Sequence, residues 1–428
     1  MDPKIRICTL ERGSQSKYAR VVCTLSIFVA ASFCLAAGRI EPDLKSLYNT
    51  HHWFALRDAV QPGKSPIFYR GAVEAIFNQP KAAEQDLRGA ISVSPNTLDA
   101  YEAQSLLVGM YLRTGEYREA LAQVELMIGD RPDAKELRNV LSLFQVLSRT
   151  PDQSVVQKQP STLQMHIEDG SMFLPVTIDG GAATYAFDTD ATLSLLSESE
   201  AKRLGLVVLD VDTKIEGMSG SGVAARIAVA NNLFLGNVHL AQVAFYVLSD
   251  KQPPFNDLPV GSRGILGIPV ILALQTLRWN PKGGTFECGF PAKPEDIRHA
   301  NVAFDDVSPV TQVFIQRRPL EFSLDTGAQQ TDLYPAFAKE FADFVGDYGK
   351  KETHKLTGIE GSATFESAVL PSVTIQVGGH DVVLNPARVY LEEHNSTSQW
   401  YFGNLGMVLL NQAHTVTLDF QAMTLTLE

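Results

Sequence analysis

The sequence has few cysteines and places three of its four near the N-terminus. Cys8, Cys23 and Cys34 precede residue 38, and only Cys288 lies further along the chain. Removal of the N-terminal segment would therefore leave one thiol and exclude an intramolecular disulfide. Cys288 ends an apolar stretch and has no His or Asp beside it in sequence, so we expect a packed, inert thiol rather than a nucleophile.

Basic clusters and metal-binding patterns are also missing. The formal net charge is −12, from 36 Lys and Arg against 48 Asp and Glu, and no run of basic residues occurs, which argues against a nucleic-acid partner. The nine His residues show no metal-ligand spacing, and no glycine-rich stretch leads into the Lys-Ser/Thr of a phosphate-binding loop. We therefore expect neither a metal nor a cofactor.

The first 38 residues combine basic side chains with a long uncharged run. Five Lys and Arg residues precede residues 21–38, which carry no charge and end in small residues, among them Ala36 and Ala37. This order is typical of a signal peptide, and an uncleaved membrane anchor is the alternative. We expect an exported protein, periplasmic or secreted, that meets a membrane only through this segment.

Residues 40–148 show helical spacing of apolar and small side chains and no strand pattern. Residues 106–132 predict a helix, a turn at Gly115 and a second helix closed by Pro132, and residues 72–95 form a weaker copy. This pattern resembles a tetratricopeptide helix-turn-helix. Two such units are fewer than a free-standing solenoid usually needs, so we expect flanking helices or packing against the rest of the chain. The resemblance implies a groove for a peptide or protein partner; a helical spacer or lid is the alternative.

A change of hydrophobic period follows. Residues 149–162 are polar and contain two prolines, which indicates a linker. Beyond them the period becomes two, as in residues 172–178 and 184–187 around a turn at 179–181. Short strands with frequent turn residues predict an all-β region up to the C-terminus.

Three features of this β region recur in the same order, about 140 residues apart, which indicates an internal duplication. An apolar strand runs into Asp188-Thr189 and again into Asp325-Thr326. A glycine-rich turn follows in both copies, and then a Gly-x-Leu-Gly segment at 264–267 and 403–406. Ser194 and Thr331 also occupy the same place in the two copies.

Each copy resembles one lobe of a retropepsin-like aspartic protease, and the pair resembles a compact two-lobed member of that superfamily. The resemblance implies lobe 1 at residues 163–295 and lobe 2 at 300–428. It assigns Asp188 and Asp325 as the catalytic pair, with supporting roles for Thr189, Asp190, Thr326 and Gly327. The glycine-rich turns would be flaps over a cleft, formed by Gly217, Met218, Ser219, Gly220, Gly358, Ile359, Glu360 and Gly361.

The resemblance implies hydrolysis of peptide bonds without a metal or a covalent intermediate. Two carboxyls held close together share one proton, so that the ionised one activates a water and the protonated one binds the peptide carbonyl. Lobe 1 departs from the family at Asp190, which stands where the family has Gly. A third carboxylate at this place would raise the pKa values of the pair, or it would point to solvent without effect. The two functional hypotheses are therefore an endopeptidase and a catalytically impaired peptide-binding or scaffold protein.

Other polar pairs are expected to be structural. Asp305-Asp306 and Glu392-Glu393 are expected to be solvated turns, and His51-His52 to lie at the surface or in packing contacts. The complete prediction is a multidomain chain: an N-terminal α-helical, tetratricopeptide-like repeat domain followed by an all-β, two-lobed aspartic protease fold.

Overall fold

The computed structural model describes residues 43–428 except 132–133, 135, 216–221, 292–295, 360 and 396. The predicted export segment, residues 1–38, lies outside this part of the chain. Among the described residues, no helix combines the length and the apolar character that a membrane span requires. The residues from 42 onward form one compact unit.

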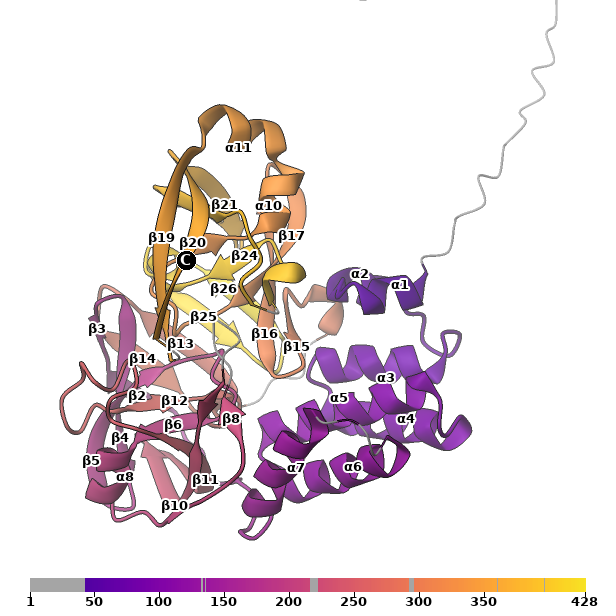
Figure 1. Ribbon diagram of the computed structural model, residues 1–428, viewed down its shortest axis with the longest axis vertical. Helices are drawn as coiled ribbons and strands as arrows, with labels where there is room; N and C mark the ends of the chain where they lie inside the picture. The colour runs from indigo at the N-terminus through magenta and orange to yellow at the C-terminus, as the bar shows by residue number, and fades with distance from the viewer. Residues whose placement is uncertain are drawn as a thin grey trace, which may run out of the picture. The chain divides into compact units, whose positions relative to one another are not determined.

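Helices occupy the N-terminal part of the described chain, as predicted (Figure 1). They are α1 (Leu44–Asn49), α2 (Trp53–Ala59), α3 (Ile67–Ile76), α4 (Pro80–Val93), α5 (Leu98–Thr114), α6 (Tyr117–Asp130) and α7 (Glu136–Leu147). From α3 to α7 each helix packs against the next. The Thr97 hydroxyl accepts a hydrogen bond from the Ala100 N–H at the start of α5, and Gly115 ends that helix at φ +78°, which confirms the predicted turn. The tetratricopeptide character of these pairs stays a prediction.

Lobe 1 is built around a nine-stranded sheet. Its strands, in the order of the sheet, are β1 (Ser154–Gln157), β11 (Val238–Leu248), β6 (Ser194–Ser197), β12 (Gly264–Leu266), β5 (Gly181–Phe187), β4 (Ser171–Ile178), β10 (Arg226–Leu235) and β7 (Val208–Leu209), with β3 (His166–Glu168) beside β4. Two helices, α8 (Glu198–Arg203) and α9 (Ile268–Leu274), follow β6 and β12. A separate two-stranded hairpin joins β8 (Lys214–Ile215) to β9 (Val223–Ala224).

Lobe 2 repeats this plan in a ten-stranded sheet. Its order is β19 (Lys350–Gly358), β20 (Gly361–Leu370), β23 (Ala387–Tyr390), β18 (Asp332–Leu333), β24 (Gly403–Leu405), β17 (Arg318–Leu324), β16 (Ser308–Ile315), β21 (Val373–Val377) and β22 (His380–Leu384), with β15 (Val302–Asp305) beside β16. The short helices are η1 (Ile297–His299), α10 (Pro335–Glu340), α11 (Ala342–Tyr348), η2 (Thr397–Gln399) and α12 (Met407–Leu410).

The duplication is visible in the strand pairing. In lobe 1, β5 runs parallel to β12, with Phe187 opposite Leu266. In lobe 2, β17 runs parallel to β24, with Leu324 opposite Leu405. The two copies of the repeated sequence therefore fold with the same pairing, and each carries its Asp-Thr motif past the end of the equivalent strand.

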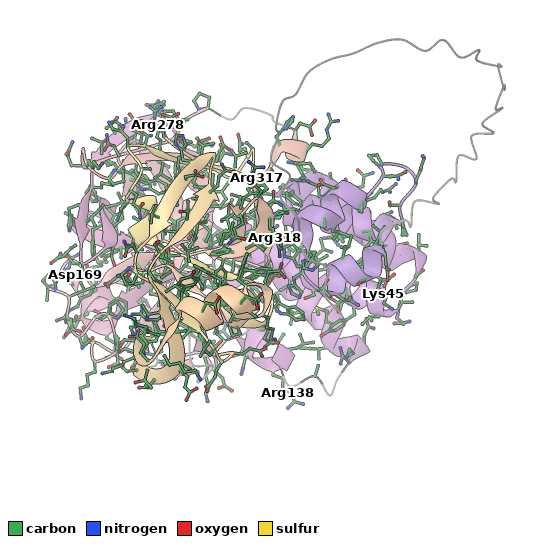
Figure 2. All side chains as sticks on the ribbon, turned by 90° about the horizontal axis from the view of Figure 1, so that it is seen from above. Lys45, Arg138, Asp169, Arg278, Arg317 and Arg318 are labelled. Carbon is green, nitrogen blue, oxygen red and sulfur yellow. The ribbon has the colours of Figure 1, made fainter. Side chains whose placement is uncertain are left out.

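A third sheet joins the two lobes. Its order is β2 (Ser161–Gln164), β14 (Thr285–Cys288), β13 (Thr276–Asn280), β25 (Val416–Asp419) and β26 (Thr424–Leu427). Thr276 to Trp279 pair with Val416 to Asp419, so the backbones of the lobes are hydrogen-bonded to each other. Apolar residues from both lobes fill one continuous core, whereas charged side chains such as Asp169, Arg278 and Arg318 are exposed (Figure 2).

The predicted linker at residues 149–162 is only partly a linker. It contains β1 and the start of β2, which pair with β11 and β14. All four residues of β1 are exposed, because this strand lies at the edge of its sheet and needs no apolar face. Because residues 149–162 are mostly polar, their sequence pattern did not predict these two strands.

Arg113 of α5 joins the helices to lobe 2. Its side chain is 3% exposed, and burial lowers the pKa of the guanidinium to about 10. The guanidinium donates to the carbonyl of Asp306 at 2.6 Å and to that of Ala75, and it lies 4.5 Å from the centre of the Phe304 ring. These contacts offset the free-energy cost of removing the guanidinium charge from water.

The turn at Asp305-Asp306 is therefore an interface: Asp306 is exposed, as a solvated turn predicts, but Asp305 is half-buried and bound by distant segments. Asp305 accepts hydrogen bonds from His51 at 3.0 Å and from the Tyr401 hydroxyl at 2.5 Å, and Trp53 donates to that hydroxyl at 3.1 Å. The ring of His51 also stacks on Trp400 at 4.4 Å. The sequence prediction failed because the partners of Asp305 come from segments far away in the chain. Glu392 and Glu393 are exposed, as predicted.

Lobe 2 also contacts the start of a helix of the N-terminal region. No side chain at the N-cap of α2 makes a capping hydrogen bond. The carboxyl of Glu321, in β17, lies near the backbone of Trp53 and Phe54 at this end of the helix. Burial at this interface raises the pKa of the Glu321 carboxyl to about 8.

Replacement of Arg113 tests this interface. We expect Arg113→Ala to lower the free energy of unfolding by about 3 kcal/mol, because it removes a buried cation together with the hydrogen bonds it makes. Urea unfolding followed by circular dichroism measures the change. Arg118→Ala is the control: Arg118 is exposed, and its loss is expected to cost less than about 0.5 kcal/mol. Equal losses in the two variants would contradict the role of Arg113.

Candidate active site

The two predicted catalytic carboxylates stand directly after equivalent strands. The Asp188 N–H donates to the carbonyl of Leu266, and the Asp325 N–H donates to that of Leu405, both at 3.1 Å. Each Asp therefore extends the parallel pairing of β5 with β12 or of β17 with β24 by one hydrogen bond. This fixes the backbone of both carboxylates on ordered strands, with the chain turning immediately afterwards.

The following threonines connect the two loops by reciprocal hydrogen bonds. The Thr189 N–H donates to Thr326 Oγ1, and the Thr326 N–H donates to Thr189 Oγ1, both at 3.0 Å. Each hydroxyl then donates into the other lobe: Thr189 to the carbonyl of Leu324 at 2.7 Å, and Thr326 to that of Phe187 at 3.0 Å. Both threonines are fully buried. The predicted supporting role of these two residues thus has a symmetric geometry that holds the loops together.

The carboxyls themselves meet at the junction of the lobes. Asp188 and Asp325 are within hydrogen-bonding reach of each other. The Asp190 N–H donates to Asp188 Oδ1, and the Ala328 N–H donates to Asp325 Oδ1, both at 2.9 Å. A Cβ atom on Gly327 would overlap the Asp188 carboxyl, so only glycine fits there.

Proximity and loss of hydration change the acidity of both groups. Desolvation raises the pKa of Asp188 well above its ordinary value, and the charges of Asp325 and Asp190 raise it further, while the backbone N–H groups of Asp190 and Ala191 oppose this change. Desolvation also raises the pKa of Asp325, but hydrogen bonds from Asn404 and from the N–H groups of Ala328 and Gly327 oppose this change. The two carboxyls are therefore unequal, and Asp325 has the better-stabilised negative charge.

Asp190 turns its side chain across to lobe 2. Its Oδ1 accepts a hydrogen bond from the Ser308 hydroxyl at 2.6 Å, while its backbone N–H serves Asp188. Desolvation and the charge of Asp325 raise the pKa of Asp190, and the hydrogen bond from Ser308 opposes this change. Because Asp190 is exposed to solvent, the charge of Asp325 is the firmer of the two causes. The carboxyl thus has its own partner and leaves the backbone contact with Asp188 intact.

The predicted flap residues are described in part. Gly217, Met218, Ser219, Gly220 and Glu360 lie outside the described residues. In lobe 2, β19 and β20 form a hairpin that closes with Gly358 opposite Gly361. The side chain of Gln252, from lobe 1, donates to the Ile359 carbonyl near the tip of this hairpin at 2.6 Å. The hairpin therefore contacts both lobes.

Sequence reasoning missed three polar residues at the site: Ser308, Ser323 and Asn404. Asn404 donates through its amide to Asp325 Oδ2 at 3.1 Å. Its position in the second Gly-x-Leu-Gly segment, where the first copy has Ile265, was the available signal. By contrast, the repeated pair Ser194 and Thr331 has equivalent roles, because each hydroxyl accepts the backbone N–H of a repeated glycine, Gly267 or Gly406.

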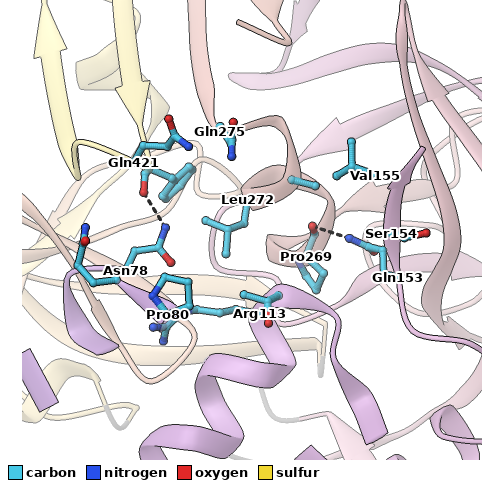
Figure 3. Close-up of a pocket in the computed structure, with 14 residues that line it drawn as sticks. Asn78, Pro80, Arg113, Gln153, Ser154, Val155, Pro269, Leu272, Gln275 and Gln421 are labelled. Atoms are coloured by element: carbon cyan, nitrogen blue, oxygen red, sulfur yellow. Dashed lines mark hydrogen bonds between the residues drawn. The ribbon is translucent and has the colours of Figure 1, made fainter. Parts of the chain in front are cut away.

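Two other features lie apart from the carboxyl pair. Cys288 is fully buried, and burial raises the pKa of its thiol to about 12, which confirms the inert thiol that was predicted. A pocket of about 530 Å³ lies between the turn before α4, β1, α9 and the segment after β25 (Figure 3). Hydrogen bonds from Asn78 to the Phe420 carbonyl and from Gln153 to the Pro269 carbonyl join residues of its lining.

The threonine bonds give a direct prediction. We expect Thr326→Val to lower the free energy of unfolding by about 2 kcal/mol, because a side chain of the same shape without a hydroxyl leaves buried polar groups unpaired. Thr326→Ser keeps the hydroxyl and loses one methyl group, at a cost of about 1 kcal/mol or less. Chemical unfolding of the two variants compares these values. Equal stability would mean that the methyl group, and not the hydroxyl, holds the loops together.

Comparisons with known proteins place the first lobe in a sequence family. The family model described as aspartyl protease matches residues 174–270, which include Asp188 and the first Gly-x-Leu-Gly segment. No curated protein matches the chain by sequence.

Three solved structures illustrate the likeness of fold. A retropepsin-like aspartic protease from Rickettsia conorii is 15% identical with a TM-score of 0.23, and the match covers 32% of this chain and 96% of that one. An aspartic proteinase from Irpex lacteus is 12% identical with a TM-score of 0.38, covering 62% and 96%. Basic 7S globulin from soybean is 10% identical with a TM-score of 0.36, covering 63% and 94%. Likenesses this weak say nothing about activity.

The family match covers one lobe, and the second lobe repeats its strand pairing and its Asp-Thr motif. The helical N-terminal region precedes both. Residues 174–270 of this chain therefore match the aspartyl protease family, and the two-lobed β region resembles the aspartic protease fold.

Proposed function

We propose that this protein is an exported aspartic endopeptidase that hydrolyses peptide bonds with a water activated between Asp188 and Asp325. One observation carries the proposal: the two carboxyls lie within hydrogen-bonding reach on loops joined by reciprocal threonine bonds. A single carboxylate on a turn would not indicate a peptidase. Two that share a desolvated site retain one proton between them and can act as acid and base together.

The chemistry follows from this shared proton. The ionised carboxylate removes a proton from a water molecule, whose oxygen attacks the carbonyl carbon of the peptide. The protonated carboxyl donates its proton to the carbonyl oxygen, which gives a neutral tetrahedral diol. The pair then gives one proton to the amide nitrogen and takes one from a hydroxyl of the diol, which breaks the C–N bond, releases the amine and the acid, and leaves one proton on the pair.

The orientation of Asp190 favours the peptidase over the impaired peptide-binding protein. The bond to Ser308 gives its side chain a partner in lobe 2, and its backbone N–H still supports Asp188, as a glycine in this place would. The departure from the family therefore leaves the geometry of the carboxyl pair in place. It changes the charge beside the pair, which affects the pH dependence.

The first experiment is cleavage of a mixed peptide library from about pH 3 to about pH 8 by the full chain. We expect turnover that a pepstatin-type inhibitor blocks, and a loss of at least about 10³-fold in Asp325→Asn and in Asp188→Asn, because each removes one half of the acid–base pair. Asp169→Asn, which changes an exposed carboxylate, is the matched control and should retain activity. Peptide binding without cleavage by the wild type at any pH would support the peptide-binding protein and reject the enzyme.

Replacement of Asp190 should change the upper end of the pH range. The charge of Asp190 raises the pKa of Asp188, and Asp188 must keep its proton to act as the acid. We therefore expect the alkaline limb of kcat/KM to move to lower pH in Asp190→Gly, by about half a pH unit to one unit. Ser308→Ala keeps the carboxylate and is expected to leave the limb at a higher pH than Asp190→Gly does. An unmoved limb in Asp190→Gly would show that the charge does not act on the pair.

A further inference from the structure

Asn404 makes a contact with the carboxyl pair that has no equivalent among the described residues of lobe 1. Its Nδ2 donates to Asp325 Oδ2 at 3.1 Å, on the oxygen that the Ala328 N–H does not use. Asn404 lies in β24, next to the strand that leads into Asp325. The amide is therefore placed by regular structure and not by a loop.

Ser323 fixes which way this amide faces. The Ser323 hydroxyl donates to Asn404 Oδ1 at 2.9 Å, and Ser323 is 4% exposed. With its oxygen engaged by Ser323, the amide presents its N–H₂ group to Asp325. The opposite orientation would place the amide oxygen against a carboxylate oxygen, which repel each other.

The matching pair in lobe 1 is apolar. Ser323 stands opposite Asn404 in the pairing of β17 with β24, and Ala186 stands opposite Ile265 in the pairing of β5 with β12. Neither Ala186 nor Ile265 has a donor that could reach Asp188. The polar pair Ser323 and Asn404 in lobe 2 thus occupies the same register as the apolar pair Ala186 and Ile265 in lobe 1.

We propose that Asn404, oriented by Ser323, is a positioning residue that makes Asp325 the ionised member of the pair and leaves the shared proton on Asp188. A donor to a carboxylate stabilises its charged form, and among the residues that the structure describes Asn404 is such a side-chain donor to Asp325. The base that activates the water is then Asp325, and the acid that binds the peptide carbonyl is Asp188. These roles rest on the proposed function, whereas the location of the proton does not.

The other titratable groups around the pair reinforce this asymmetry. Asp190 acts on Asp188 through its charge, and the buried Tyr334 hydroxyl lies near Asp325. Asp332 of β18 stands opposite Asn404 of β24, but its carboxylate forms an ion pair with Arg388 at 3.4 Å. None of these side chains donates a charge-stabilising hydrogen bond to Asp188, whose donors are the backbone N–H groups of Asp190 and Ala191.

The test compares Asn404→Leu, which keeps the approximate shape and loses the donor, with the wild type. Loss of the donor raises the lower apparent pKa of the pair, so the acid limb of kcat/KM is expected to move up by about one pH unit. Ser323→Ala should give a smaller shift in the same direction. Ile265→Leu is the matched control in lobe 1 and should leave the limb in place. An unmoved acid limb in Asn404→Leu would overturn the proposal.

A second measurement does not depend on turnover. Titration of the full chain carrying ¹³C-labelled aspartate carboxyls follows the pair directly by NMR, and the lowest-titrating resonance of the pair should move up by about one unit in Asn404→Leu. A shift in a protein that cleaves nothing would support the role of Asn404 and reject the peptidase. Cleavage by the wild type together with an unshifted resonance in Asn404→Leu would support the peptidase and reject the role of Asn404. If Asn404→Leu fails to fold, the same titration of Ser323→Ala tests the proposal, and its lowest-titrating resonance should also move up.

Discussion

Two carboxyls that lie within hydrogen-bonding reach, partly shielded from water, repel each other once both are ionised, and the rest of the β region depends on holding them there. The reciprocal bonds of Thr189 and Thr326 do this at the loops, and the sheet shared by the two lobes does it for the strands beneath. A pair of like groups brought together by one flexible loop would separate. Here each is attached to its own sheet, and the sheets are joined through backbone hydrogen bonds.

The two lobes are equal in fold and unequal in chemistry. The same strand pairing carries Asp188 and Asp325, but lobe 1 adds a carboxylate at Asp190 and lobe 2 adds an amide at Asn404. Both changes act in one direction: a negative charge near Asp188 favours its protonated form, and a donor on Asp325 favours its ionised form. A duplicated and symmetric frame therefore holds two carboxyls in unequal surroundings.

The repeated motifs predicted most of the site, because their spacing is a property of the chain itself. Asp188, Thr189, Asp325 and Thr326 could be placed from sequence because equivalent strands bring equivalent residues together. Asn404 and Ser308 could not, since their partners depend on which strand lies beside which. The same reason explains Asp305, whose contacts with His51 and Tyr401 join distant segments. Strand β1 was hidden for a different reason, as an exposed edge strand needs no alternating pattern.

The turn between β15 and β16 connects the helical region with the carboxyl pair. On one side Arg113 of α5 donates to the Asp306 carbonyl, and His51 binds Asp305. Two residues further on, Ser308 holds the Asp190 side chain, whose backbone N–H supports Asp188. The contacts of the helices and the partner of Asp190 thus lie within four residues of one turn, from Asp305 to Ser308. The helical region and the carboxyl pair are connected through this turn.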